Sequence, residues 1–326
     1  MFSSIQLRNF KSFINLDIEV RPLTVLSGLN SGGKSSILQA IRIFIDYNKG
    51  ITPKRLSLKS LLSKDSFYEI GIDKRVLRVN KEGEQQTYSL SLQDKENDYS
   101  YSYISADRIG PMDLFDLSST YSKDVGADGR NVYSYLEFHQ DTKINEKLVR
   151  APNGVSLLVL NLKNWMDIVT PGFEFKYEID SSREKVIPFF NGVKPSETGF
   201  GLSYVFPVIV SLLVPCAESG LLLLENPEAH LHPRGQFELG KLIALSASTG
   251  KQIILETHSE HIIDGIRVAV KDESIKSEEV SMYYLYRDDY ESPSLVEQIN
   301  VKSNGKLDKW PAGFFDQSTI SKMELL

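Results

Sequence analysis

The feature that most constrains the fold of this chain is a glycine-rich loop at residues 28–36, which read GLNSGGKSS. The loop fits the phosphate-binding pattern G-x-x-x-x-G-K-[ST], with Gly28, Gly33, Lys34 and Ser35 at the fixed positions. A β-rich run at 23–26 precedes it, and apolar residues with helical spacing follow at 36–44. This order of strand, loop and helix predicts an α/β fold that binds a nucleoside triphosphate. The alternative is a chance glycine turn between a strand and a helix.

Each residue type in the loop has a chemical role. The glycines let backbone N–H groups turn toward phosphate oxygens. Lys34 brings a positive charge to the β- and γ-phosphates, and the Ser35 hydroxyl can coordinate Mg²⁺. The following helix points the positive end of its dipole at the same anion. We therefore expect nucleotide contacts from Asn30, Ser31, Gly32, Gly33, Lys34, Ser35 and Ser36, with Mg²⁺ at Ser35.

The composition is that of an ordinary globular protein. The 326 residues, 41% hydrophobic and 25% charged, suffice for one large α/β domain or two smaller ones. No apolar run reaches transmembrane length, and the first residues lack the pattern of a secretory signal. The single cysteine, Cys216, cannot form an internal disulfide, which fits a reducing compartment. We expect a cytoplasmic protein that makes no membrane contact.

The net charge of −6 at pH 7 argues against a surface that binds nucleic acid everywhere. Residues 49–81 nevertheless hold nine Lys or Arg and three acids. This local excess could contact DNA, RNA or an acidic partner. The alternative is an ordinary solvated face of the protein.

The pattern of the remaining chain alternates between strands and helices. Strands are expected at 3–8 and 13–20, and then at 76–79, 87–92 and 99–105, with a turn at 81–84, in an antiparallel side sheet. Residues 110–155 are polar with helical pieces, and 155–169 predict an amphipathic helix, before strands at 173–179 and 186–190. From residue 199 the α/β pattern returns, with helices at 202–216, 234–246 and 260–270 and strands at 220–224, 252–256 and 280–286.

Two of these strands end in residues suited to phosphate chemistry. The apolar strand at 220–224 is followed by Glu225, Asn226 and Glu228. A buried strand can aim a terminal carboxylate at a Mg²⁺ ion, as in a Walker B element. His258 follows the strand at 252–256, where it could hydrogen-bond a γ-phosphate or an attacking water. Because ligands gather at the carboxyl ends of parallel strands, both ends are candidate parts of one site.

Four stretches in this order resemble the ABC-type ATPases of the SMC/RecF/OLD-like group, often called AAA family ATPases. They are RNFKSF at 8–13, the loop at 28–36, ENPEAHLHP at 225–233 and THS at 257–259. Further stretches resemble a small subfamily with a C-terminal domain of unknown function: ETGFGLSY at 197–204, YISADRIGP at 103–111 and WPAGFFD at 310–316. Members of that subfamily often occur in bacterial defence or DNA-maintenance operons, beside a separate nuclease or other effector.

The resemblance implies an ABC-ATPase-like P-loop fold with a mostly parallel core sheet, an antiparallel side sheet and a helical subdomain. It implies one ATPase domain over 1–326: a Walker A lobe at 1–110, an insert at 111–198, a lobe at 199–288 and an extension at 289–326. It also implies a homodimer that sandwiches ATP. The loop of one subunit, together with Lys11, would then meet Gly199, Gly201 and Ser203 of the other.

One position departs from the family pattern. Most ABC ATPases carry a glutamate after the Walker B acid, and this chain carries Asn226. An amide can orient a water molecule but cannot take its proton. The Walker B acid is Glu225 rather than the commoner aspartate, and is the expected metal ligand with Ser35. We predict slow hydrolysis of ATP, unless Glu228 or His258 supplies the missing role.

Three functions follow from these observations. The first is an ATPase subunit that regulates a separate effector, a nuclease or toxin, in defence against phage. The second is a DNA-binding clamp of the repair type that uses residues 49–81. The third, a small-molecule kinase, shares the phosphate loop but conflicts with the ENPEAHLHP and THS stretches.

Overall fold

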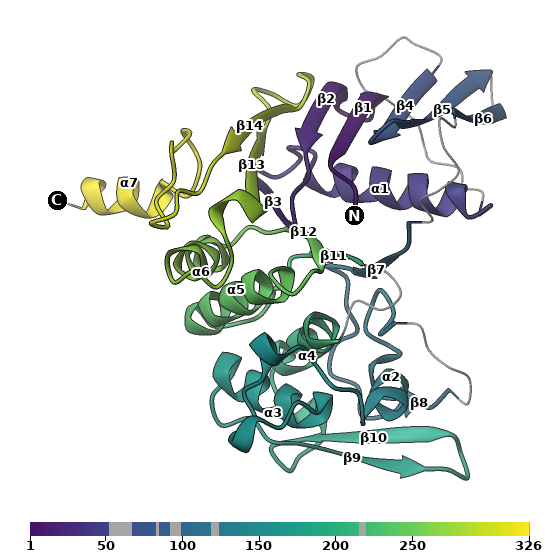
Figure 1. The fold of residues 1–326 in the computed structure, drawn as a ribbon, viewed down its shortest axis with the longest axis vertical. Helices are drawn as coiled ribbons and strands as arrows, with labels where there is room; N and C mark the ends of the chain where they lie inside the picture. The colour runs from purple at the N-terminus through teal and green to yellow at the C-terminus, as the bar shows by residue number, and fades with distance from the viewer. Residues whose placement is uncertain (52–66, 83–84, 92–98, 119–123, 215–219, 326) are drawn as a thin grey trace. The chain divides into compact units, whose positions relative to one another are not determined.

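The computed structural model describes residues 1–326 except 52–66, 83–84, 92–98, 119–123, 215–219 and 326. The chain forms two compact units, whose elements can be followed in Figure 1. Unit 1 comprises Met1–Tyr101, Ser277–Lys302 and Lys306–Leu326. Unit 2 comprises Ser102–Lys276 and Ser303–Gly305. The division into four regions expected from the sequence stays a prediction.

Unit 1 contains a five-stranded antiparallel sheet in the order β2-β1-β4-β5-β6. Its first two strands are joined by a tight turn in which Lys11 has φ of 54°. Alternate residues of β1, such as Ile5 and Leu7, are fully buried, as expected for a strand with one face on the core. The strands are β1 (Ser4–Phe10), β2 (Phe13–Glu19), β4 (Phe67–Ile72), β5 (Arg75–Glu82) and β6 (Gln85–Ser91).

The phosphate loop of unit 1 lies between strand β3 (Leu23–Gly28) and helix α1 (Lys34–Asn48). β3 pairs in parallel with β13 (Val280–Tyr286), which pairs antiparallel with β14 (Leu295–Ile299). Helix α1 buries one apolar face that includes Ile37, Ile41 and Phe44. Helix α7 (Gln317–Glu324) follows near the C-terminus.

Unit 2 is built on two short parallel strands, β11 (Leu221–Glu225) and β12 (Gln252–Glu256). β12 is buried along its whole length and β11 at every residue but Glu225, which explains their apolar sequences. Helices α5 (Pro233–Ala247) and α6 (Glu260–Lys271) lie side by side (Figure 1). Gly240 makes this close approach possible, because a Cβ at that position would lie only 2.3 Å from the carbonyl oxygen of Ile262.

The rest of unit 2 is helical with a small antiparallel sheet in the order β8-β10-β9. Phe173, Phe175, Phe190 and Phe206 form one aromatic cluster with Tyr133. The elements are α2 (Val132–His139), α3 (Leu158–Val169), α4 (Phe200–Leu213), β8 (Phe115–Asp116), β9 (Phe175–Asp180) and β10 (Lys185–Phe190). Short 3₁₀ helices of unit 2 lie at Glu146–Leu148, Pro152–Gly154 and Pro195–Glu197, and unit 1 has one at Ser277–Glu279.

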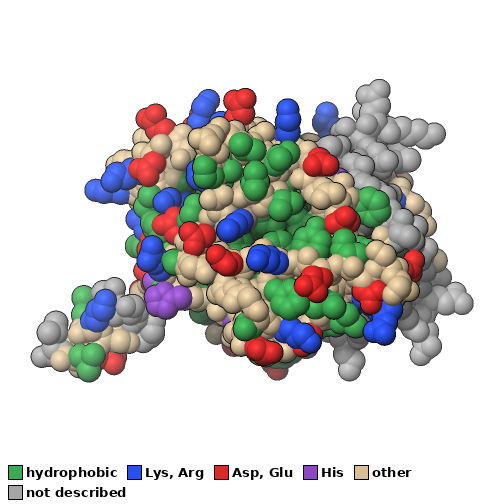
Figure 2. All heavy atoms as spheres, turned by 90° about the horizontal axis from the view of Figure 1, so that it is seen from below, with side chains coloured by type: hydrophobic (Ala, Val, Ile, Leu, Met, Phe, Trp, Pro, Cys, Tyr) green, Lys and Arg blue, Asp and Glu red, His purple; other side chains and the backbone are tan. Residues whose placement is uncertain are grey.

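A groove of about 560 Å³ opens in unit 2 beside α3 and the β9–β10 hairpin. Val159, Phe175, Tyr177 and Phe189 line it, with Lys176 and Glu178. Figure 2 views the molecule from the side on which β9 and β10 lie in Figure 1. Hydrophobic side chains there are grouped between side chains of both charges.

The predicted mixed α/β class, with a parallel-rich sheet and an antiparallel sheet, is confirmed. The prediction for 99–105 is wrong in one respect: β7 (Tyr101–Ile104) lies next to β11 rather than in the antiparallel sheet. Strands β4, β8 and β14 and helix α7 were not predicted. Residues 83–84 of the predicted turn, and Cys216, lie outside the described residues. Among the described residues, no helix combines the length and the apolar character needed to cross a bilayer.

Candidate nucleotide site

The phosphate loop rests against the end of strand β13. A Cβ at Gly28, where φ is 138°, would lie 1.9 Å from the carbonyl oxygen of Leu285. A Cβ at Gly32 would lie 2.6 Å from the same oxygen. The Leu29 N–H donates to that oxygen at 3.1 Å. Glycine is therefore required at both positions, because the loop backbone approaches a neighbouring backbone too closely for a side chain.

The loop's third glycine connects it to the turn between β1 and β2. A Cβ at Gly33 would lie 2.6 Å from the ring of Phe13, the last residue of the RNFKSF stretch. Ser12 in the same turn accepts a hydrogen bond from the Ser294 backbone N–H at 2.8 Å. The RNFKSF stretch thus supports the loop physically, which gives a structural reason for its occurrence together with a phosphate loop.

Lys34 lies inside the loop, where phosphate groups are expected. Its side chain is buried, and Nζ donates to the carbonyls of Gly28 at 3.0 Å and Leu29 at 2.9 Å. Gly33 begins helix α1 without a side-chain cap hydrogen bond. The first N–H groups of a helix can bind an anion together with such a lysine. Asn30, Ser31 and Ser35 are exposed around it.

We expect Gly28→Ala to lower the free energy of unfolding by about 3 kcal/mol, since overpacking adds to the strain of a left-handed alanine. It should also weaken ATP binding. The matched control is Gly192→Ala, at φ 81° with no heavy atom within 4 Å of the added Cβ. That change should cost about 1 kcal/mol and leave ATP binding intact. Urea unfolding and nucleotide titration measure both; equal losses in the two variants would contradict the steric argument.

Lys11, a predicted nucleotide contact, lies in the β1–β2 turn and donates a hydrogen bond to Gln39 Oε1 on helix α1. Burial lowers the pKa of the Lys11 ammonium. The side chain is therefore tied to the helix that follows the phosphate loop. Its contact with a nucleotide stays a prediction.

In unit 2, Glu225 ends strand β11 and is half-buried. Its Oε2 accepts a hydrogen bond from the Ala106 backbone N–H at 3.3 Å. The next residue, Asn226, has φ of 42°, and its backbone N–H donates to the Glu256 carbonyl at 2.9 Å. Asn226 Oδ1 is buried and has no hydrogen-bond partner among the described residues. A buried carbonyl oxygen of this kind is costly unless something bonds it, so a bound water or ligand group fits here.

Glu228 connects this turn to the end of strand β12. Its Oε1 accepts hydrogen bonds from the Thr257 hydroxyl and the His258 backbone N–H, both at 2.8 Å. Burial raises the pKa of the Glu228 carboxyl. The His258 side chain is exposed, while Ser259 caps helix α6 by accepting from the Ile262 N–H at 3.1 Å. Glu228 therefore fixes the backbone that carries His258.

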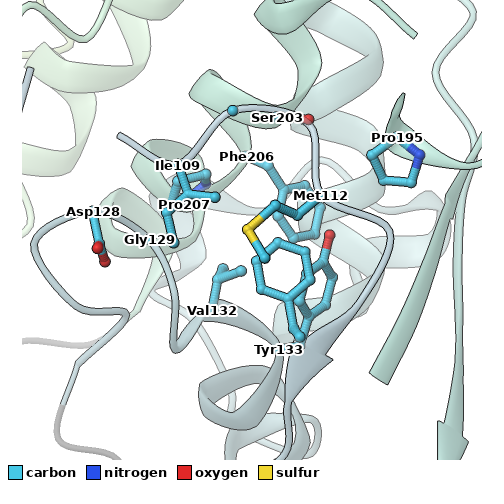
Figure 3. Close-up of a pocket in the computed structure, with 12 residues that line it drawn as sticks. Ile109, Met112, Asp128, Gly129, Val132, Tyr133, Pro195, Ser203, Phe206 and Pro207 are labelled. Atoms are coloured by element: carbon cyan, nitrogen blue, oxygen red, sulfur yellow. The ribbon is translucent and has the colours of Figure 1, made fainter. Parts of the chain in front are cut away.

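The glycine-rich element at 199–203 forms the start of helix α4. Gly199 is exposed, and a Cβ at Gly201 would lie 2.6 Å from the carbonyl oxygen of His230. Ser203 Oγ is buried without a hydrogen-bond partner among the described residues. Ser203 lines a pocket of about 20 Å³ with Tyr133 and other residues (Figure 3), enough space for about one water. The predicted nucleotide contacts of Gly199, Gly201 and Ser203 stay predictions.

The structure places one further residue at this site, Arg108, whose contact no sequence pattern predicted. Arg108 belongs to the stretch at 103–111, which the sequence marked only by resemblance. Its guanidinium donates to the backbone carbonyls of Glu225 at 2.9 Å and Asn226 at 2.8 Å. No spacing rule could have found this contact, because Arg108 lies 117 residues before Glu225 in the chain.

The donor groups present fit a nucleotide with Mg²⁺. Mg²⁺ prefers oxygen ligands, takes few of them from the protein and takes others from phosphates and water. The Ser35 hydroxyl in unit 1 and the Glu225 carboxylate in unit 2 are of the required type. A group of three or more His, Cys, Asp or Glu side chains suited to a metal does not occur among the described residues.

Comparison with known proteins agrees with this picture. A family described as "AAA ATPase domain" matches residues 1–179, more than half of the chain. "AAA domain, putative AbiEii toxin, Type IV TA system" matches 106–264, and "Protein of unknown function (DUF3696)" matches 275–325. None of the curated proteins compared with the chain matches it.

Solved structures show the same fold. The SmcHead bound to the C-winged helix domain of ScpA has a TM-score of 0.59 at 14% identity, with 92% of this chain and 98% of that one covered. An Smc head domain with an extended coiled coil, bound to the C-terminal domain of ScpA from Pyrococcus furiosus, has a TM-score of 0.56 at 12% identity. The match covers 99% of this chain and 98% of that one.

The phosphate loop and the match to the AAA ATPase domain family identify an ATP hydrolase, and its fold is that of an SMC head. The chain belongs to the AAA ATPase domain family. The resemblance to the SMC/RecF/OLD-like group is thereby confirmed, and the match at 275–325 agrees with the expected C-terminal domain of unknown function.

Proposed function

We propose that this ATPase holds ATP for long periods and uses it to dimerise, and that the ATP-bound dimer regulates a separate effector protein. The observation that carries the proposal is Asn226, which follows Glu225 at the end of β11 with its Oδ1 buried and unpaired among the described residues. An amide oxygen can orient an attacking water by accepting its hydrogen bond. It has no basicity with which to remove the proton. Hydrolysis therefore proceeds slowly.

The two nearby candidates for the missing base, Glu228 and His258, differ in their surroundings. Glu228 is 8% exposed, and its Oε1 is engaged by Thr257 and His258. A carboxylate held in this way supports the His258 backbone. His258 remains the candidate for hydrogen-bonding the γ-phosphate or the water, since its side chain is exposed at the end of β12.

In the proposed dimer, each ATP contacts the loop of one subunit and the start of α4 of the other. Gly199 at the exposed start of α4, with no side-chain cap, supports this role, because uncapped N–H groups there can bind a phosphate. Ser35 and Glu225 would hold Mg²⁺, which supplies charge neutralisation at the β- and γ-phosphates. The proposed location is the cytoplasm.

One finding supports a separate partner protein. The structures with a similar fold hold an Smc head together with a domain of another protein, ScpA. The description of the family matched at 106–264, "AAA domain, putative AbiEii toxin, Type IV TA system", supports the setting in defence. We propose a nuclease or toxin as the effector and defence against phage as the setting.

The rate of hydrolysis tests the role of Asn226. We expect Asn226→Glu to accelerate single-turnover cleavage of bound ATP by about 100-fold or more, the lower end of what a general base contributes. Asn153→Glu is the matched control, since Asn153 also has positive φ, at 60°, and lies in a 3₁₀ helix of unit 2. An unchanged rate in Asn226→Glu would count against the idea that this position limits turnover.

Dimerisation is tested by light scattering of the purified protein with ATP, with ADP and without nucleotide. A dimer is expected only with ATP. DNA binding in a salt series examines the alternative role as a DNA clamp. In the described part of 49–81, Arg75 is buried and Arg78 is paired with Glu69, which leaves Lys49 and Lys74 exposed for such a contact. Steep, salt-dependent DNA binding by the isolated protein would overturn the proposed role.

A further inference from the structure

Unit 2 contains a buried arginine for which the proposed mechanism gives no role. Arg108 is 2% exposed and lies in the loop that follows β7. No carboxylate of the described residues forms an ion pair with it within 4.0 Å, and its Nε has no hydrogen-bond partner among the described residues. Burying a charge in this way is costly unless the surroundings compensate for it.

The compensation comes from three backbone carbonyls, two of them at the end of β11, and from the nearby charges of Glu228 and Glu225. Nη1 donates to Ser105 O at 2.7 Å and to Glu225 O at 2.9 Å, and Nη2 donates to Asn226 O at 2.8 Å. One planar guanidinium therefore holds two consecutive residues, the Walker B acid and the residue after it. The fork geometry of arginine suits this task, whereas the point charge of lysine does not.

The same loop also holds the Glu225 side chain. The backbone N–H of Ala106 donates to Glu225 Oε2 at 3.3 Å. The segment 105–108 thus fixes both the main chain and the carboxylate of Glu225. The left-handed φ of 42° at Asn226 needs such support, because this conformation is strained for a residue with a side chain.

The loop contacts helix α4 as well. The Arg108 guanidinium carbon lies 5.1 Å from the centre of the Tyr204 ring, within range of a cation–π interaction. A Cβ at Gly110 would lie 2.9 Å from the Phe200 ring. Phe200 and Tyr204 both belong to the first turns of α4; Phe200 lies within the glycine-rich element at 199–203, and Tyr204 directly follows it.

We infer that Arg108 is a positioning residue for ATP hydrolysis, which holds Glu225 and Asn226 in place and links their geometry to the start of helix α4 through Tyr204. The inference rests on the proposed roles of Glu225 and Asn226. A shift of the start of α4 would move the Tyr204 ring, then the guanidinium, and then the two carbonyls that it holds. Burial lowers the pKa of Arg108 to about 10, so the guanidinium stays charged at neutral pH.

The test compares Arg108→Lys with Arg183→Lys, a matched change at an arginine whose side chain is 81% exposed. We expect Arg108→Lys to lower kcat roughly 10- to 100-fold, since misplacing a catalytic group by about 1 Å has effects of that size. KM for ATP and the Kd of a non-hydrolysable analogue should stay within about threefold, because the interaction is used in the reaction and not in binding. Arg183→Lys should match the wild type.

Tyr204 supplies a second comparison that does not depend on how well Arg108→Lys folds. Tyr204→Phe keeps the ring face and should retain near wild-type kcat, whereas Tyr204→Leu should lose severalfold. An unchanged kcat in Arg108→Lys, equal kcat in the two Tyr204 variants, or a rise in KM that matches the loss of kcat would each overturn the inference. Glu225→Gln distinguishes a failure of this inference from a failure of the proposed function. If that variant hydrolyses ATP normally, the proposed site itself is wrong.

Discussion

Lys34→Ala will weaken ATP binding by about 100-fold or more, the effect expected when a buried charge-assisted contact of about 3 kcal/mol is removed. The Lys34 ammonium is 4% exposed and lies within the loop, held by the carbonyls of Gly28 and Leu29. Alanine leaves those two carbonyls without this donor and removes the positive charge from the phosphate site. Hydrolysis and ATP-dependent dimerisation should be lost together with binding.

The measurement is titration with a fluorescent ATP analogue, accompanied by thermal unfolding with and without ATP. Lys49→Ala is the matched control, since Lys49 is exposed directly after the same helix. It should bind ATP like the wild type. If Lys34→Ala retains normal affinity, the phosphate loop does not bind the nucleotide in the proposed way.

Glu225→Gln will lower kcat by about 100-fold or more, while leaving ATP binding and the ATP-dependent dimer intact. Glutamine keeps the size of the side chain and an oxygen that can accept the Ala106 N–H bond. It lacks the negative charge with which Glu225 would hold Mg²⁺. The substitution therefore separates the chemistry at this position from its packing.

Steady-state hydrolysis and light scattering with ATP measure the two effects separately. Glu174→Gln, an exposed glutamate of unit 2, is the control and should behave as the wild type. Normal turnover in Glu225→Gln would reject the proposed metal ligand. Loss of ATP binding would show instead that the carboxylate serves binding rather than the reaction.

Patterns in the sequence predicted the phosphate loop and the buried strands because those elements are the most regular part of the chain. Strands β11, β12 and β13 are buried along almost their whole length, so they appear as continuous apolar runs. In the loop at 28–36, Gly28 and Gly32 lie so close to the Leu285 backbone that no larger residue fits. The ends of these strands could therefore be located within one or two residues.

Elements with a weaker pattern were missed for physical reasons. Strand β14 has only one buried residue, Ile299, and so shows no clear alternation. Strand β4 has three buried residues in a row at its end, one of them Gly71. The tyrosines at 99–103 predict a strand but not its partner, since pairing with β11 depends on residues far away in the sequence.

The site was predicted at Glu225, Asn226 and His258, yet the contacts that hold them were not. Arginine is usually exposed, so no sequence rule indicates that Arg108 is buried. Its role depends on three carbonyls, which any residue type could provide. Glu228 was expected to be a possible base, and its hydrogen bonds to Thr257 and His258 could be seen only in the folded chain.

The pairing of β3 with β13 also bears on how the protein is made. Gly28 lies against Leu285, and every hydrogen bond between these two strands joins residues about 256 positions apart or more. Ribosomes release the N-terminal part of a chain first, and its domains begin to fold during synthesis. The phosphate loop leaves the ribosome early but gains its supporting strand only after residue 286. A partly synthesised chain therefore cannot complete the packing of its phosphate loop before synthesis has passed that point.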